Sequence, residues 1–259
     1  MFDTLHIHLP YRFLEERLES LIEARLQPEI AFRGPDLDLA TLAELRIYGE
    51  RLEDAGLAVT VHGPFHDLNP GAMEPLVWQA TRQRFLQTLE AAAALRARLV
   101  VFHPGYDRWK YGGQDHLWLE QNLLFWPPLL LVARHAGIRI AIENIFEYAP
   151  ANLLALFQAF PQPDFGHCFD VGHWQLFAET SLEEWFSVLG PHLLHLHLHD
   201  NRGSADEHLP VGEGIIDFPQ LFALLGSLPG RPSMTLEAHT PEALERSLLG
   251  VAPFMRPLS

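Results

Sequence analysis

The segment between residues 193 and 218 has an unusual density of side chains that can bind a metal ion. Histidines alternate with leucines and an Asp-Glu-His triplet follows, so the ligand-type side chains include His195, His197, His199, Asp206 and His208. Strict alternation predicts a β-strand, because strand side chains point to opposite faces at every second residue. Three imidazoles would then share one face. Imidazole and carboxylate are common ligands of zinc and manganese, so the segment predicts metal chemistry.

Ligand-type residues also end other short apolar runs of the chain. Six consecutive runs have one at or near the last position: His62, His103, Glu143, Asp170, His197 and Glu237. His173 follows Asp170 by three residues. Several carboxylates buried together are costly without nearby cations, so the pattern implies a bound divalent metal. Zinc suits the imidazole-rich positions and manganese the carboxylate-rich ones, and the site has ligands enough for two or three ions.

The scaffold around these residues consists of eight short apolar runs, each followed by a longer segment with apolar residues at helical spacing. The predicted strands are Leu5–Leu9, Glu29–Phe32, Ala58–His62, Leu99–His103, Ile138–Glu143, Phe165–Asp170, Leu193–His199 and Met234–Glu237. The predicted helices are Tyr11–Leu26, Leu39–Ala55, Ala72–Arg96, Asp115–Ala136, Pro150–Phe160, Ser181–Leu189, Phe218–Leu228 and Pro241–Leu249. This alternation predicts an α/β fold, a (β/α)8 TIM barrel with its active face at the carboxyl ends of the strands.

Length and composition fit one such barrel. The chain has 259 residues, 48% of them hydrophobic, and no linker or repeat divides it, so residues 1–259 are expected to form a single domain. No apolar run is long enough to cross a membrane, and the N-terminus lacks the pattern of a signal peptide. The single cysteine, Cys168, excludes an internal disulfide and fits a reducing compartment. We therefore expect a cytoplasmic protein without a membrane partner, and the sequence leaves its oligomeric state open.

The charge balance argues against nucleic acid as a partner. The net charge is −15, and Lys110 is the only lysine. A protein that binds polyanions needs a basic face, and the segments after the predicted strand ends offer few cations. The segment 106–113, which contains Arg108 and Lys110, is predicted to be a loop. A single lysine also argues against Schiff-base chemistry.

The strand-end motifs resemble the xylose-isomerase-like TIM barrels, a superfamily of sugar and sugar-phosphate isomerases and epimerases that also includes endonuclease IV (AP endonuclease family 2). The matching motifs are His62-Gly-Pro, His103-Pro-Gly, Glu143-Asn, Asp170-Val-Gly-His173, His197-Leu-His-Asp200, Asp206-Glu-His208 and Leu-Glu237. Isomerases and epimerases hold one divalent ion with a set that matches Glu143, Asp170, His197 and Glu237. Endonuclease IV holds three zinc ions with additional ligands that match His62, His103, His173, Asp206 and His208.

Two functions follow from this resemblance. The preferred one is a metal-dependent isomerase or epimerase of a sugar or sugar phosphate, which transfers a proton next to a carbonyl through an enediolate. Glu143 and Glu237 would act as base and acid from opposite sides. Epimerases also carry a second glutamate that contacts substrate, for which Glu147 is the nearest candidate. The alternative is an endonuclease IV-like hydrolase that cleaves phosphodiesters at abasic DNA with a trinuclear zinc site. The few cations favour the isomerase.

Outside the ligand set, five residues are candidates for contact with the substrate: His6, His8, Arg108, Trp109 and Arg202. His6 and His8 alternate on the first predicted strand, where they would either face the substrate or pack in the core. Arg108 and Arg202 are candidate phosphate handles, against the simpler role of solvated surface arginines. His195 is expected to fill the barrel interior beneath the site.

Overall fold

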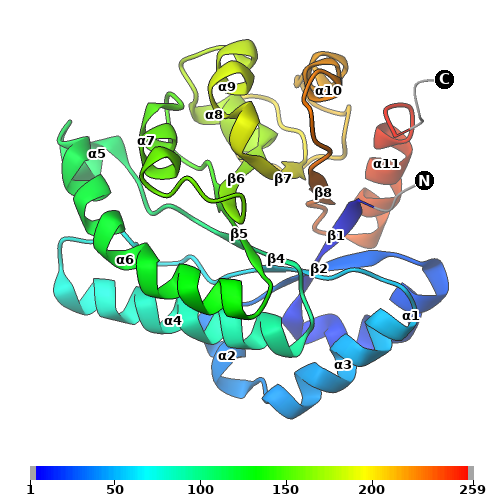
Figure 1. The fold of residues 1–259 in the computed structure, drawn as a ribbon. Helices are drawn as coiled ribbons and strands as arrows, with labels where there is room; N and C mark the ends of the chain where they lie inside the picture. Colours follow the sequence, from blue (N-terminus) through cyan, green and yellow to red (C-terminus); the bar gives the residue numbers. More distant parts are fainter. Residues whose placement is uncertain (1–3, 256–259) are drawn as a thin grey trace.

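The computed structural model describes residues 4–255, which form a closed barrel of eight parallel strands with helices around the outside (Figure 1). The strands pair in chain order, and β8 closes the barrel against β1. Their bounds are β1 (Leu5–Pro10), β2 (Gln27–Ala31), β3 (Thr60–His62), β4 (Leu99–Phe102), β5 (Arg139–Glu143), β6 (Phe165–Asp170), β7 (Leu193–Leu198) and β8 (Ser233–Leu236). The predicted (β/α)8 architecture is therefore confirmed, with strand ends that lie within two residues of the predicted ones.

Every predicted helix is present. These helices are α1 (Leu14–Ala24), α3 (Leu42–Asp54), α4 (Pro75–Ala94), α6 (Asp115–His135), α7 (Ala151–Ala159), α9 (Leu182–Leu189), α10 (Phe218–Gly226) and α11 (Pro241–Val251). Short 3-10 turns lie at Tyr11–Phe13 and Gly190–His192. Side-chain caps determine where several of these helices begin. The first backbone N–H groups of a helix lack intrahelical partners, so a side-chain oxygen just before the helix can accept a hydrogen bond from one of them. The Ser181 side chain, for example, accepts from Glu184 N at 3.3 Å and begins α9.

The sequence patterns did not predict three short helices: α2 (Gly34–Leu39), α5 (Arg108–Tyr111) and α8 (Val171–Phe177). The prediction of a loop over 106–113 is therefore wrong for the residues in α5. Asp107 starts this turn by accepting a hydrogen bond from Trp109 N at 2.8 Å. Helices of four to seven residues complete at most two turns, too few to produce a recognisable apolar period.

The core has an outer and an inner part. Between strands and helices, large aromatic side chains pack together, as where the rings of Phe85 and Phe102 stack with centroids 3.9 Å apart. Inside the barrel, a smaller apolar cluster consists of Leu99, Val101, Ala141 and Cys168. The two parts arise because successive residues of a strand point to opposite faces. Each fully buried large apolar side chain stabilises the fold by about 1.5–3 kcal/mol. This inner cluster does not extend to the carboxyl ends of the strands, where polar side chains lie.

Among the helices of residues 4–255, none has both the length and the apolar composition needed to cross a membrane.

Candidate metal centre

The carboxyl ends of six consecutive strands bring the predicted ligands to one face of the barrel. His62, Glu143 and Asp170 are the last residues of β3, β5 and β6, and His197 is the penultimate residue of β7. His103 and Glu237 come directly after β4 and β8. Because the strands are parallel, these ends meet at the same rim.

Glu143 lies at the centre of this group and is buried. Four imidazole nitrogens lie within 3.1–3.4 Å of its carboxylate: those of His62, His103, His173 and His197. Burial alone would raise the pKa of Glu143, but the neighbouring His197 and His103 hold it well below its usual range. The group is therefore a carboxylate that depends on positive charge around it.

His197 connects Glu143 to the other carboxylates. Its Nδ1 lies 3.2 Å from Glu237 Oε1, 3.4 Å from Glu143 Oε2 and 3.8 Å from Asp170 Oδ2. Within residues 4–255 this nitrogen has no hydrogen-bond partner, although the side chain is fully buried. A buried nitrogen that faces three carboxylates without a hydrogen bond is the arrangement expected of a metal ligand.

Asp206 and His208 complete the face from the loop that follows β7. Asp206 Oδ2 lies 3.1 Å from His208 Nε2 and 3.4 Å from His173 Nε2, while His208 Nδ1 lies 3.5 Å from Glu237 Oε2. Burial would lower the pKa of His208, but the hydrogen bond with Asp206 and the charge of Glu237 raise it to about 9. All nine residues predicted as ligands are thus brought together.

The donor set fits divalent metal. Several triads place one ligand atom from each member within 4.8 Å of the others, among them His62–Glu143–His197 and His199–His208–Glu237. Four carboxylates here, Glu143, Asp170, Asp206 and Glu237, can be balanced either by protonated imidazoles or by cations. The mixture of imidazole and carboxylate groups suits zinc and also accepts manganese.

Two further buried residues contact this group: His199, which the alternation of histidines and leucines indicated, and Glu29, which no sequence pattern indicated. His199, whose alternation with His197 was noted, places Nε2 3.1 Å from both oxygens of Asp170 and stacks on His208 with ring centroids 4.0 Å apart. Glu29 on β2 lies 3.0 Å from His197 Nε2. The period of two indicated His199, but Glu29 has no sequence signal because β2 approaches β7 only across the closed barrel.

The two histidines of β1 have different surroundings. His8 is half-buried, and its Nδ1 lies 4.0 Å from Glu237 Oε1 at the edge of the centre. His6 is buried deeper, with Nδ1 3.3 Å from Pro28 O and its ring against His195. Burial lowers the pKa of His6 to about 4. His6 therefore packs in the interior, whereas His8 remains a candidate for substrate contact.

His195 also lies inside the barrel, as expected. Its ring nitrogens lie 2.6 Å from Ser233 Oγ and 2.8 Å from Thr235 Oγ1, and the side chain is fully buried.

The candidate phosphate handles are engaged in ion pairs. Arg108 pairs with Glu179 and lies over the rings of Trp109 and Tyr148, while Arg202 pairs with Glu207. The Trp109 side chain is 81% exposed on α5. These residues lie in the segments that follow β4 and β7, but both guanidinium groups already have carboxylate partners. A phosphate would have to compete with those carboxylates.

Glu147 is buried beside the centre and lacks a full set of partners. Its Oε2 accepts from Ile145 N at 2.7 Å, and Oε1 has no hydrogen bond with any described residue. Burial raises the pKa of Glu147 to about 8, partly offset by the Ile145 hydrogen bond. A carboxyl with this pKa can exchange protons near neutral pH.

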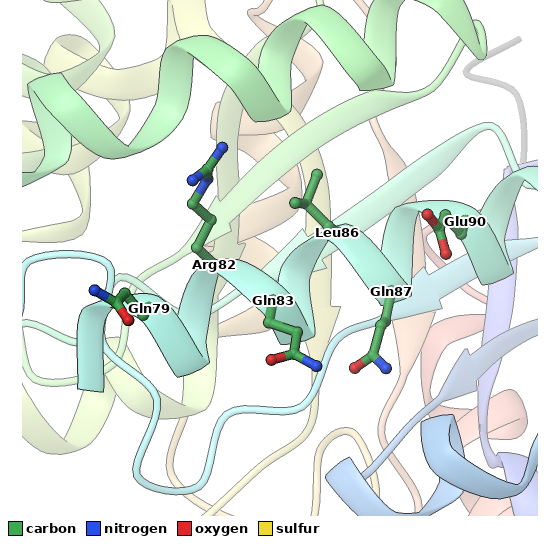
Figure 2. Close-up of a pocket in the computed structure, with 6 residues that line it drawn as sticks. All are labelled: Gln79, Arg82, Gln83, Leu86, Gln87 and Glu90. Carbon is green, nitrogen blue, oxygen red and sulfur yellow. The ribbon is translucent and has the colours of Figure 1, made fainter. Parts of the chain in front are cut away.

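A separate surface hollow of about 390 Å³ lies on helix α4 (Figure 2). Its lining is Gln79, Arg82, Gln83, Leu86, Gln87 and Glu90. These residues come from one helix and include none of the ligand-type side chains of the barrel face. The hollow is therefore distinct from the candidate metal centre.

Comparison with known proteins agrees with this architecture. Residues 22–256 match the family model described as xylose isomerase-like TIM barrel. The chain belongs to the xylose isomerase-like TIM barrel family. A relative of this xylose isomerase-like barrel, the uncharacterized protein MJ1311 of Methanocaldococcus jannaschii, is 31% identical over 174 residues, a match that covers 64% of this chain and 59% of the relative. The chain thus spans less than two thirds of that relative.

Two solved structures of similar fold cover nearly the whole xylose isomerase-like barrel. The TTHB071 protein from Thermus thermophilus, after soaking with ZnCl2, is 27% identical with a TM-score of 0.79, and the alignment covers 97% of this chain and 98% of that one. A D-tagatose 3-epimerase-like protein is 24% identical with a TM-score of 0.82, covering 96% and 97%. The second likeness shows the fold alone.

Proposed function

We propose that this barrel is a metal-dependent sugar isomerase or epimerase. The observation that carries the proposal is a pair of buried carboxylates on either side of one imidazole nitrogen. His197 Nδ1 lies 3.4 Å from Glu143 Oε2 and 3.2 Å from Glu237 Oε1. Two carboxylates at one metal-binding position can remove a proton from a bound sugar and return it elsewhere. This arrangement supports proton transfer next to a carbonyl.

Glu143, Asp170, His197 and Glu237 would hold the ion shared by both family patterns. A divalent ion there, manganese or zinc, would supply a Lewis acid that polarises the carbonyl and favours the enediolate. Glu143 would remove the proton through a carboxylate oxygen that faces the sugar, and Glu237 would deliver it on the opposite side. The surrounding histidines orient both carboxylates and keep them ionised, because they hold the pKa of Glu143 well below its usual range and lower that of Glu237 to about 2 against the effect of burial.

The substrate that fits these surroundings best is an unphosphorylated ketose. The Arg108 and Arg202 guanidinium groups have partners in Glu179 and Glu207, and the chain carries a net charge of −15. A dianionic phosphate would meet carboxylates with no unpaired arginine at these two positions. A neutral sugar meets no such barrier and can hydrogen-bond to imidazole and carboxylate groups.

Exchange of a substrate C–H proton with deuterium from solvent tests the proposal. Protein loaded with Mn²⁺ or Zn²⁺ is incubated in D₂O with a panel of ketoses and ketose phosphates, and NMR measures deuterium at the carbons beside the carbonyl. We expect exchange with at least one ketose, reduced by about 10²–10⁴-fold in Glu143→Gln and Glu237→Gln. Glu90→Gln on the outer face of α4 is the matched control and should exchange like wild type. Equal exchange in Glu143→Gln and wild type would contradict the assigned roles.

One observation favours a second candidate function. Beyond the four shared ligands, the five further positions of the endonuclease IV pattern are close to the same centre, including Asp206 and His208. A cluster of this composition could bind three zinc ions and activate water to hydrolyse a phosphodiester at abasic DNA. We place this function second because DNA binding depends on phosphate contacts from Lys and Arg, and Arg108 and Arg202 are paired.

Incision of duplex DNA that contains an abasic-site analogue separates the two functions. We expect no product with zinc or manganese at low salt. Incision that rises with protein concentration and is lost in Glu143→Gln would replace the isomerase proposal by the hydrolase.

A further inference from the structure

A further buried carboxylate, Glu29, lies below the candidate metal centre, in the interior of the barrel. Glu29 is in the middle of β2, beside Thr60 of β3 and His8 of β1, and its side chain is fully buried. It belongs to neither family ligand set described above. A fully buried carboxylate is costly unless its oxygens receive hydrogen bonds or positive charge, so its partners indicate its role.

Three partners from three strands fix one oxygen of Glu29. Oε2 accepts hydrogen bonds from Thr60 Oγ1 at 3.1 Å and Thr235 Oγ1 at 3.0 Å, and it lies 3.1 Å from His195 Nε2. Thr235 Oγ1 is also 2.8 Å from His195 Nε2. The carboxylate plane is therefore held by β3, β7 and β8 together, which sets where the other oxygen points.

The other oxygen faces His197. Glu29 Oε1 and His197 Nε2 lie 3.0 Å apart, and neither atom has a well-aligned hydrogen bond with any residue the structure describes. The second nitrogen of the same ring, Nδ1, faces Glu143 and Glu237. The His197 imidazole thus connects the candidate metal centre to the barrel interior. Its Nδ1 faces the ligand carboxylates, and its Nε2 faces Glu29.

This arrangement controls which nitrogen of His197 is free to bind metal. A neutral imidazole carries one N–H, and a carboxylate beside Nε2 favours the proton there. The lone pair of Nδ1 then points at Glu143 and Glu237. Carboxylates that hold ligand histidines in this way also raise the basicity of the ligand nitrogen.

We propose that Glu29 is a positioning residue that fixes the Nε2–H tautomer and the ring orientation of His197, so that Nδ1 serves the metal centre. The role rests on the metal centre of the proposed function but not on the sugar reaction. A separate ion among Glu29, His195 and His197 is disfavoured, because Oε2 already receives hydrogen bonds from two hydroxyl groups.

Zinc affinity tests this role without any sugar. Zn²⁺ is titrated into metal-free wild type, Glu29→Gln and Glu90→Gln in competition with a chelating indicator, and circular dichroism verifies the fold. We expect Glu29→Gln to bind about 10–100-fold more weakly than wild type, the usual effect of removing such a partner. Glu90→Gln makes the same substitution on the outer face of α4, away from the ligand residues, and should stay within about twofold of wild type.

Unchanged affinity in Glu29→Gln, or an equal loss in both variants, would overturn the proposal. A measurement on wild type covers the case in which Glu29→Gln does not fold. Long-range ¹H–¹⁵N NMR of Zn²⁺-loaded, histidine-labelled protein reports the protonated nitrogen of each assigned ring. We expect the Nε2–H form for His197, and an Nδ1–H form would overturn the proposal whatever the variants do.

Discussion

Among single residues, Glu143 has four imidazole neighbours in the candidate centre. Its Oε2 lies 3.1–3.4 Å from nitrogens of His62, His103 and His197, and its Oε1 lies 3.1 Å from His173 Nδ1, so one carboxylate is shared among four imidazoles. A carboxylate shared in this way can bridge two metal ions. Asp206, in contrast, contacts the group from a loop and is exposed on one side.

Removal of the Glu143 side chain and removal of the Asp206 side chain should therefore release different amounts of bound metal. We expect Glu143→Ala to lose most of the bound metal, because it takes away the shared ligand. Asp206→Ala should lose at most one ion. Elemental analysis of wild type and both variants after identical dialysis measures the difference. If Asp206→Ala empties the protein as fully as Glu143→Ala, the division into inner and outer ligands is wrong.

Glu147 gives a prediction about pH. Its pKa rises from an ordinary 4.5 to about 8 on burial, so between these pH values the folded state holds a proton that the unfolded state has released. Stability therefore falls as pH rises from 4.5 to 8. In chelator-treated protein, Glu147→Gln should leave the free energy of unfolding nearly unchanged at pH 5 and raise it by about 3–5 kcal/mol at pH 8. Urea unfolding across this range measures the change, and a constant difference between variant and wild type would contradict it.

Among the structural elements, the segment between β7 and α10 shows how a loop can hold ligands in place. Asp200 is fully buried, and its carboxylate accepts hydrogen bonds from the backbone N–H groups of Asn201, Gly212, Gly214 and Ile216 at 2.8–3.2 Å. Its backbone also pairs with Leu209. A Cβ at Gly214 would come within 2.2 Å of Asp200 Oδ1, so the glycine allows this close approach. The Gly212-Glu-Gly214 motif therefore organises the loop that carries Asp206 and His208.

Asp200→Asn should accordingly loosen the outer ligands. The amide keeps the shape but replaces one acceptor oxygen by a donor, which leaves buried N–H groups unpaired at a cost of about 1–3 kcal/mol. We expect lower thermal stability and partial loss of one metal ion. Asp217→Asn is the matched control, since Asp217 caps α10 by accepting from Gln220 N at 2.9 Å without contacting a ligand. It should change stability little, because asparagine caps a helix about as well as aspartate, and it should keep the full metal content. Equal metal loss in both variants would argue against a specific role for Asp200.

For the molecule as a whole, the proposed centre joins much of the barrel. Its ligands lie at the carboxyl ends of six strands, in helix α8 and in one long loop, and the chain has a net charge of −15. Three divalent ions would change that charge to −15 + 6 = −9. Bound cations would thus reduce repulsion among buried carboxylates and hold distant strands together.

Metal removal should therefore lower the stability of the entire barrel. A ligand present at 100 times its Kd and bound only by the folded state stabilises by about 2.7 kcal/mol. For a protein of this size that corresponds to about 5–10 °C in Tm. We expect chelation to lower Tm by this amount, and Zn²⁺ or Mn²⁺ to restore it where NaCl of equal ionic strength does not. An unchanged Tm after complete chelation would contradict a structural contribution of the metal.

The barrel and most of the candidate centre could be predicted from local patterns in the chain. Alternating apolar periods predict eight strands and eight helices, and parallel strands must bring residues such as His62, Glu143 and Glu237 to one rim. The comparisons confirm the family, while a single domain over residues 1–259 and the roles of the individual residues stay predictions. The partners of Arg108, the depth of His6 and the contact of Glu29 with His197 required the folded structure. They depend on barrel closure and side-chain packing, which bring together residues whose separation along the sequence carries no local signal.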